Sequence, residues 1–273
     1  MDGNMIKEAE IELLINELAQ RYGYDFSNYA RASLRRRVNR LLVIDRIPSF
    51  AELLYRVKND GDYLTHIVEA LTVNVTEMFR DPSVFKIIRE ELLPVLATHP
   101  FIRIWHAGCA SGEEVYSMAI LLEEANLLNK SLIYATDLNA SIIENIQKGI
   151  FPLSRMQQYS ENYIASGGKK DFSSFYTAQY GWAKFNQKLK QKMIAATHNL
   201  VSDRSFNEFQ LIFCRNVLIY FDKILQDKVL KLFDDSLETL GFLVLGSKEN
   251  LRFSILANTF TQVGKEKIWR KMQ

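Results

Sequence analysis

The stretch FIRIWHAGCASGEE, residues 101–114, decides the fold, because it reads as a buried strand, a glycine-bearing loop and the start of a helix. LIYATD (132–137), FQLIFC (209–214) and FLVLG (242–246) are further strand candidates, and helices are expected at about 113–124, 140–148 and 223–239. Alternating strands and helices imply right-handed crossovers and a largely parallel sheet. TFTQVG (259–264) and KIWRKM (267–272) predict a closing antiparallel pair.

The chain before residue 100 is predicted to be helical. Apolar residues recur with a helical period from Met5 to about Tyr22 and from about Ser27 to Val43. Three more helices are expected after Ser49, which fits a capping box with Glu52, after Asp60-Gly61, and after Asp81-Pro82. Residues 150–200 break the later alternation, and SFYTAQYGWAKFN (174–186) and KLKQKMIAA (188–196) read as short antiparallel strands of an inserted subdomain.

The composition fits a globular protein of one or two domains. The chain has 273 residues and a formal net charge of +2, too small to indicate a nucleic-acid or anionic-membrane ligand. Two distant cysteines, Cys109 and Cys214, predict neither a disulfide framework nor a metal site. The sequence has no signal-peptide pattern and no apolar run that suits a membrane span, so we expect a cytoplasmic protein.

Three loops follow predicted strands at the carboxyl edge of the sheet, where open parallel sheets bind ligands. They are HAGCASGEE (106–114), ATDLN (135–139) and CRNVLIYF (214–221). The first has glycines at 108 and 112 but neither a GxGxxG pattern nor a P-loop lysine, which disfavours a dinucleotide or a triphosphate. Glu113 and Glu114 would repel a pyrophosphate and suit a cationic ligand such as S-adenosylmethionine. A plain tight turn with acids that compensate the helix dipole explains this loop equally well.

Asp137 ends the second predicted strand, 29 residues after Gly108. A carboxylate there can accept hydrogen bonds from both hydroxyls of a ribose. The alternative is that Asp137 caps the following helix, and the sequence does not separate the two roles. Together, the glycine loop and this acid favour a nucleoside-binding half-fold more than either feature does alone.

Four motifs resemble those of the CheR family of chemotaxis protein-glutamate methyltransferases: TVNVTEMFR (72–80), WHAGCASGEEVYS (105–117), ATD (135–137) and CRNVLIYF (214–221). The resemblance covers roughly residues 10–270 and implies an α/β protein. It implies an N-terminal helical domain (1–80), a linker helix (81–98) and a Rossmann-like methyltransferase domain (99–273), with an inserted antiparallel β-subdomain at about 150–197. The implied reaction transfers a methyl group from S-adenosylmethionine to glutamate carboxylates of a chemoreceptor-type protein.

The resemblance also implies the site residues. With Gly108 of the first loop, the cofactor-binding candidates are Asn74, Thr76, Arg80, Glu114, Asp137, Asn199, Leu200, Asn216 and Val217. Arg80 and Tyr220 are the catalytic candidates: Arg80 would orient a carboxylate of the substrate or of the cofactor, and Tyr220 would lie beside the reactive methyl group. The alternatives are a surface arginine and an aromatic core residue. No metal is implied.

The sequence departs from the family pattern at two places near the expected site. Val115 stands where family members usually have proline, and SKEN (247–250) replaces the common serine-glutamate pattern. Valine removes no group that would contact a ligand, although proline at an early helical position would pre-set the backbone. The second departure has no evident consequence at the level of sequence.

Arginines crowd the second predicted helix. Arg36, Arg37 and Arg40 are candidates for docking the acidic cytoplasmic helices of a chemoreceptor, because residues three or four apart share a helix face. The alternative is a solvated charged face. We expect no nucleic-acid partner, contact with the membrane only through the receptor, and a monomer.

Two other classes of function stay open. One is a regulatory protein that binds S-adenosylmethionine without turnover, and the other is a methyltransferase for another protein, a nucleic acid or a small molecule. For the leading hypothesis no general base is needed, because a glutamate carboxylate is ionised at neutral pH. The protein's task would then be alignment and desolvation, without a covalent intermediate.

Overall fold

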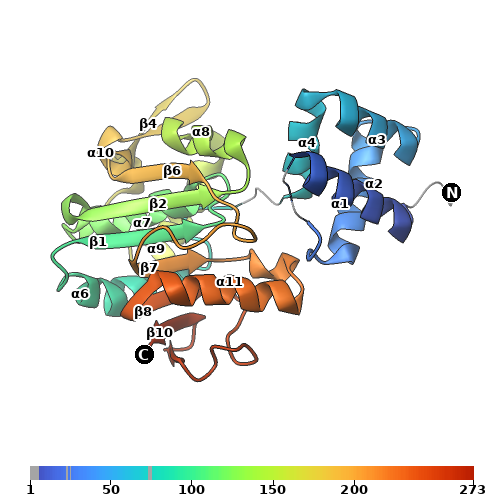
Figure 1. Cartoon of the computed structure of the whole chain (residues 1–273). Coiled ribbons are helices and arrows are strands. Elements are labelled where there is room, and N and C mark those ends of the chain that lie inside the picture. Colours follow the sequence, from blue (N-terminus) through green and yellow to red (C-terminus); the bar gives the residue numbers. More distant parts are fainter. Residues whose placement is uncertain (1–5, 23, 25, 73–75) are drawn as a thin grey trace. The chain divides into compact units, whose positions relative to one another are not determined.

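The computed structural model describes residues 6–22, 24, 26–72 and 76–273. The chain divides into two compact units (Figure 1). The first comprises Met1–Asn74 and Ile219–Lys228, and the second comprises Val75–Leu218 and Val229–Gln273. Within the described ranges, no helix combines the length and the apolar character that crossing a membrane requires.

Four helices make up most of the first unit: α1 (Glu8–Tyr22), α2 (Arg31–Ile44), α3 (Phe50–Asn59) and α4 (Gly61–Leu71). Each buries the side chains that recur every three or four residues, so the predicted helices are confirmed. Helix α2 begins at Arg31 and not near the predicted Ser27, because the chain first turns and Tyr29 forms an isolated β-bridge with Phe221.

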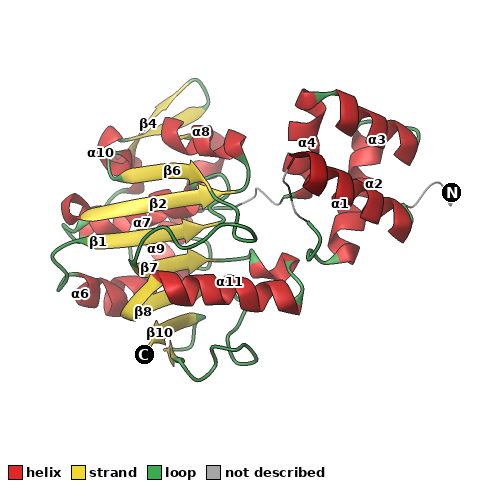
Figure 2. Cartoon of the chain, in the orientation of Figure 1, coloured by secondary structure: helices red, strands yellow, loops and turns green. Residues whose placement is uncertain are grey.

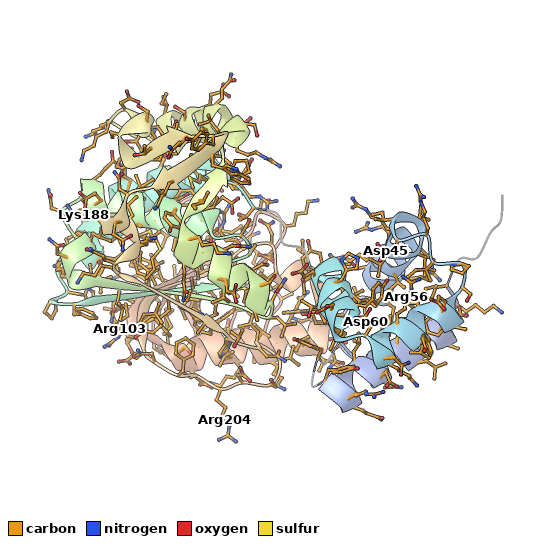
Figure 3. All side chains as sticks on the ribbon, turned by 90° about the horizontal axis from the view of Figure 1, so that it is seen from above. Asp45, Arg56, Asp60, Arg103, Lys188 and Arg204 are labelled. Carbon is orange, nitrogen blue, oxygen red and sulfur yellow. The ribbon has the colours of Figure 1, made fainter. Side chains whose placement is uncertain are left out.

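Side-chain caps set the starts of α3 and α4. Ser49 Oγ accepts a hydrogen bond from the Glu52 amide at 3.2 Å, and Asp60 Oδ1 accepts one from the Tyr63 amide at 3.1 Å. The Glu52 carboxylate accepts a hydrogen bond from Arg56 Nε at 2.8 Å and does not complete the predicted capping box (Arg56 and Asp60 are labelled in Figure 3).

A seven-stranded sheet forms the centre of the second unit, in the order β6-β2-β1-β7-β8-β10-β9 (Figure 2). The first five strands in this order are parallel, and β10 and β9 are antiparallel, as predicted. The strands are β1 (Ile102–Ala107), β2 (Ser131–Asp137), β6 (Met193–Thr197), β7 (Phe209–Cys214), β8 (Leu237–Leu245), β9 (Phe260–Val263) and β10 (Ile268–Lys271).

Helices follow the parallel strands, as the sequence pattern predicts. They are α7 (Glu113–Glu124) after β1, α8 (Ala140–Lys148) after β2, and α11 (Lys223–Ser236) after β7. Before the sheet, α5 (Pro82–Ile87), a π-helical turn (Ile88–Leu92) and α6 (Leu93–Leu96) follow one another without a break. Asp81 and Pro82 stand at the expected start of α5, but the Asp81 side chain makes no capping hydrogen bond there. Its carboxylate contacts an arginine of the site described below.

A three-stranded antiparallel sheet of order β3-β5-β4 lies in the segment between α8 and β6. Its strands are β3 (Ile150–Pro152), β4 (Tyr176–Gln179) and β5 (Trp182–Phe185), and the helices α9 (Met156–Ala165) and α10 (Gln187–Lys190) accompany it. The prediction of antiparallel strand structure at 174–186 is confirmed, because β4 and β5 pair there as a hairpin. An ion pair of 2.7 Å joins Lys188 of α10 to Glu123 of α7 (Lys188 is labelled in Figure 3).

Two details of the predicted elements are wrong. Residues 188–196 are not a strand of the small sheet: they end α10 and enter β6, which pairs in parallel with β2 at the edge of the main sheet. The sequence misleads here because an edge strand is half exposed and carries the same mixture of apolar and polar residues. Helix α11 ends at Ser236, and β8 begins at Leu237 and runs through Gly241, where the predicted strand had not yet begun.

The buried glycine that ends α8 gives a test of the packing. Gly149 has a φ of 65°, and a Cβ atom there would lie 2.2 Å from the buried Tyr116 hydroxyl oxygen. Gly149→Ala should lower the free energy of unfolding by about 1–3 kcal/mol beyond the cost of the left-handed backbone. Gly181→Ala is the matched control, because its φ is 79° and nothing lies within 4 Å of the added Cβ. Equal losses in urea unfolding of the two variants would contradict this packing.

Candidate functional site

The carboxyl ends of the parallel strands meet along one edge of the main sheet. The loop after β1 has positive φ at Gly108, Ala110 and Gly112 (73°, 47° and 92°). The amides of Gly108 and Cys109 both donate to the Thr136 carbonyl oxygen near the end of β2, at 2.8 and 3.0 Å. These contacts fasten the glycine loop to the neighbouring strand.

Gly108 also touches the loop after β7. A Cβ atom on Gly108 would lie 2.6 Å from Cγ2 of Val217. Only a residue without a side chain fits there at this φ. The structure therefore brings Gly108 and Val217 together, two residues singled out from sequence 109 positions apart.

Asp137 connects the loops after β1 and β2. Its two carboxylate oxygens accept hydrogen bonds from the amides of Ala110 and Asn139, at 3.0 and 3.1 Å. Burial raises the pKa of Asp137, and these amide donors offset part of that rise. The helix-cap alternative is wrong, because Asn139 caps α8 by accepting a hydrogen bond from the Ser141 amide at 2.9 Å. Each Asp137 oxygen keeps a lone pair for a further donor.

Glu114 lies at the start of α7 in a buried ionic network. Its Oε1 is 2.9 Å from His106 Nδ1 and its Oε2 is 3.0 Å from Arg215 Nη1. Burial alone would raise the pKa of Glu114, but the hydrogen bond from His106 and the charge of Arg215 outweigh it and hold the pKa below its ordinary value. The His106 ring stacks on Phe213, with 4.3 Å between ring centroids.

Arg215 is the centre of this network, and the sequence analysis assigned it no role. Its Nη2 contacts Asp81 Oδ2 at 2.6 Å and donates to the Arg80 carbonyl oxygen at 3.0 Å. The guanidinium therefore joins the end of β7, the start of α7 and the segment before α5. A usable signal was present, since an arginine directly after a fully buried strand must find acidic partners.

Asn216 occupies the next position with a φ of 61°. Its amide donates to Glu249 Oε2 at 3.0 Å, and the Gly246 amide donates to the same oxygen at 2.6 Å. Within the part of the chain that the structure describes, the buried Asn216 Oδ1 has no hydrogen-bond partner. Glu249 belongs to the SKEN segment, whose departure from the family pattern had no evident consequence, and here it orients the loop after β7.

Asn199 and Leu200 follow β6, the strand next to β2. The His198 amide donates to the Asp137 carbonyl oxygen at 3.0 Å, which places this loop at the same edge. Asn199 Oδ1 accepts a hydrogen bond from the Val201 amide at 2.9 Å, so the side chain shapes its own turn. Leu200 is half-buried.

The segment before α5 contains three predicted cofactor residues. Thr76 and Arg80 are half-buried, while Asn74 lies outside the described residues. The guanidinium of Arg80 forms no hydrogen bond or ion pair with any described residue, although the Arg80 carbonyl is fixed by Arg215. The Arg80 backbone is thus part of the ionic network, whereas the Arg80 guanidinium has no partner among the described residues.

Tyr220 and Arg37 belong to the first unit and contact each other there. The guanidinium carbon of Arg37 lies 4.5 Å from the centroid of the Tyr220 ring, and Arg37 Nη1 donates to the Leu71 carbonyl oxygen. Burial lowers the pKa of Arg37. Arg36 and Arg40 are exposed. Arg37 therefore differs from the other two docking candidates, because its charge is engaged inside its own unit.

The edge suits a ligand that offers hydrogen-bond donors and positive charge. Asp137 and Asn216 Oδ1 supply acceptors, and Gly108 allows close approach of a backbone.

Burial raises the thiol pKa of Cys109 and of Cys214, so neither supplies a thiolate nucleophile at neutral pH. No cluster of metal-binding side chains occurs among the described residues.

One cavity lies apart from this edge. It has a volume of about 460 Å³ and is lined at the far end of α7 by Glu124, Ala125 and Leu127, together with Arg89 and Lys170. Helix α7 starts at the edge with Glu113 and ends at Glu124. The cavity is therefore separated from Glu114 by nearly the whole helix, and we do not include it in the site.

Two adjacent glutamates with opposite pKa shifts test the network. Glu114→Gln should lower the free energy of unfolding at neutral pH by about 3 kcal/mol, because Arg215 loses a buried partner. A carboxyl with a lowered pKa stabilises the fold above its unfolded pKa of about 4.3 and loses this effect as the pH falls through the folded value. The deficit of Glu114→Gln in urea unfolding should therefore shrink on acidification.

Glu113→Gln is the matched control for that measurement. Burial raises the pKa of Glu113, so its ionisation weakens the fold as the pH rises through the folded pKa. This variant should lose no stability at neutral pH. Parallel pH profiles for the two variants would refute the ionic network.

Comparisons with known proteins identify the family of the chain. Residues 9–72 match the family model of the CheR methyltransferase all-alpha domain, and residues 74–268 match that of the CheR methyltransferase SAM binding domain. The protein named methyltransferase Cher3 of Pseudomonas putida is 45% identical over 265 residues, which cover 97% of each chain.

Two chemotaxis protein methyltransferases are also similar. That of Borreliella burgdorferi is 29% identical over 90% of both chains. That of Salmonella typhimurium is 28% identical over 96% of this chain and 92% of its own. The two domain matches together, and the Pseudomonas relative, extend over nearly the whole sequence. The chain therefore belongs to the CheR family and is an S-adenosylmethionine-dependent methyltransferase.

Proposed function

We propose that this methyltransferase esterifies glutamate side chains of a chemoreceptor-type protein. The observation that carries the proposal is the acceptor-lined edge around Asp137 and Asn216, next to an arginine, Arg80, whose charge has no partner among the described residues. Acceptors suit the cationic methyl donor, and a free guanidinium suits a carboxylate. Relatives named chemotaxis protein methyltransferases support the choice of substrate.

The cofactor would lie across the ends of β1, β2 and β7. When bound, S-adenosylmethionine supplies a methyl group on a sulfonium leaving group. Asp137 would accept hydrogen bonds from the ribose hydroxyls, and Asn199 with Leu200 would flank the adenine. Asn216 Oδ1 and Val217 would contact it from the loop after β7, and Glu114 would add negative charge. Asn74, Thr76 and Arg80 would close over it.

The substrate needs orientation and no proton transfer. A glutamate carboxylate is ionised at neutral pH, so the chain supplies no general base. Arg80 would hold the substrate carboxylate or that of the cofactor, and Arg215 fixes the backbone that carries it. Tyr220 stays a catalytic candidate, and within its own unit its ring packs against the guanidinium of Arg37. Holding the carboxylate, the methyl carbon and the sulfur in line can lower the activation barrier by several kcal/mol, up to about 7–11 in ideal cases.

The exposed arginines of α2 would dock the receptor's acidic cytoplasmic helices. Arg36 and Arg40 are exposed and lie four residues apart on one face. Arg37 is omitted from this surface because of its contacts with Leu71 and Tyr220. The enzyme would act in the cytoplasm as a monomer and approach the membrane only through the receptor.

Radiolabelled S-adenosylmethionine and a receptor cytoplasmic fragment test the proposal. The label should enter the fragment and be released as methanol by mild base, because a glutamyl methyl ester is base-labile. Base-stable label would indicate N-methylation. Binding of the cofactor without any transfer would indicate a regulatory protein, and either result would contradict the proposal.

Asp137→Ala should weaken binding of S-adenosylhomocysteine by about tenfold or more, since two ribose hydroxyls would lose their acceptor. Calorimetry measures the dissociation constant directly. Asp171→Ala is a suitable control, because Asp171 is an exposed cap in the segment before β4. If Asp137→Ala binds as tightly as the control, Asp137 does not belong to the site.

Reversing the charges of Arg36 and Arg40 to Glu should raise KM for the receptor fragment by about tenfold at low salt and flatten its salt dependence. Cofactor affinity should not change. Lys86→Glu with Lys265→Glu makes the same change in net charge at exposed positions outside α2. The docking face lies elsewhere if both double variants change KM alike.

A further inference from the structure

The loop after β8 exposes apolar and cationic side chains at its tip. We call residues 247–259, between β8 and β9, the β8 loop; it belongs to the red, C-terminal part of the chain in Figure 1. Phe253 is 85% exposed and Ile255 is 62% exposed. Lys248 and Arg252 are exposed as well, and neither side chain forms a hydrogen bond or ion pair with a described residue. The loop's one acid, Glu249, is buried.

The loop that exposes these side chains is anchored to the core on both sides of its tip. Leu251 and Leu256 bury their side chains on either side of the tip, at 0% and 5% exposed. Between them, Ser254 Oγ donates to the Leu251 carbonyl oxygen at 2.8 Å, and the Leu256 amide donates to Ser254 Oγ at 3.2 Å. The backbone of the loop thus has its own anchors, which leave Phe253 and Ile255 pointing away from the core.

The β8 loop starts at the cofactor edge. Glu249 Oε2 accepts the amides of Gly246, at the end of β8, and of Asn216, at the end of β7. A Cβ atom on Gly246 would lie 2.7 Å from the Asn216 amide nitrogen, so the two loops are in contact. A protein that presents a side chain to this edge must therefore lie close to the base of the β8 loop.

We propose that the β8 loop is a docking surface for the helical protein substrate, an inference that rests on the proposed function. Phe253 and Ile255 contact an apolar strip on the substrate helices, and Lys248 and Arg252 pair with the acids beside it. The charges of the loop complement a substrate rich in glutamate. Aromatic residues and arginine are enriched at protein interfaces, where a few residues contribute most of the binding energy.

The surface differs in chemistry from the arginine face of α2. The α2 face offers charge, which speeds and orients encounter and weakens with salt. The β8 loop adds apolar contact, which salt does not screen. It lies in the same unit as the acceptors of the cofactor edge, so contact there positions the target glutamate for reaction.

The double variant Phe253→Ser with Ile255→Ser tests this surface. Its KM for the receptor fragment should rise by about tenfold, with kcat at saturation and the dissociation constant of S-adenosylhomocysteine changed by less than about twofold. Ile164→Ser, an exposed position on α9, is the control and should keep the wild-type KM. An unchanged KM in the double variant would overturn the inference.

A second measurement does not depend on the stability of a variant. A photo-crosslinking phenylalanine analogue at position 253 of the otherwise wild-type enzyme should form a crosslink to the receptor fragment. A crosslink to a second enzyme molecule instead would overturn the inference in favour of a self-contact. Absence of esterification by the wild-type enzyme would refute the proposed function itself, a result distinct from failure of the loop variant alone.

Discussion

The carboxyl edge of the sheet depends on one buried guanidinium. Arg215 forms ion pairs with Glu114 at the start of α7 and with Asp81 before α5, and it donates to the Arg80 carbonyl. Removing one partner of such a buried group leaves an uncompensated charge, which costs about 3–5 kcal/mol. The same contacts fix the relative positions of three chain segments that are far apart in sequence. In the proposed site, binding of the cofactor and orientation of the substrate carboxylate would both depend on this ionic network.

The acidic side chains at this edge have pKa values shifted in different directions, because their surroundings differ. Glu114 keeps its charge because His106 and Arg215 surround it, whereas burial makes ionisation of Asp137 and Glu113 less favourable. A cationic ligand beside Asp137 would favour its ionised form and would itself be bound more tightly. For methyl transfer between a sulfonium and a carboxylate, the two opposite charges decrease as the transition state forms. Surroundings of low polarity around the reacting groups would favour that change.

Much of the fold could be predicted because its signals are local. Strand and helix alternation after residue 100 and helical periodicity before it gave the parallel sheet and the helical unit. β6 was misplaced because its pairing with β2 is a long-range property that its half-exposed pattern does not encode. Helix α9 was missed because its polar, tyrosine-containing sequence resembles a loop.

The candidate site was predictable in part, and for a clear reason. Gly108 directly follows β1 and Asp137 ends β2, and topology brings such positions together. Asn216, the second residue after β7, was named through the family resemblance. The sequence did not reveal the roles of Arg215 and Glu249, because these roles depend on partners 101 and 33 residues away. The contact between Arg37 and Tyr220 likewise has no signature in the arginine cluster of α2, which reads as a uniformly charged face.

The most direct test of this account is a crystal structure with S-adenosylhomocysteine bound. The account predicts the nucleoside across the ends of β1, β2 and β7, with its ribose on Asp137 and the sulfur facing the side of Arg80. It is contradicted if that edge stays filled by protein side chains while the nucleoside binds elsewhere, or if Asp137 makes no contact with the ligand.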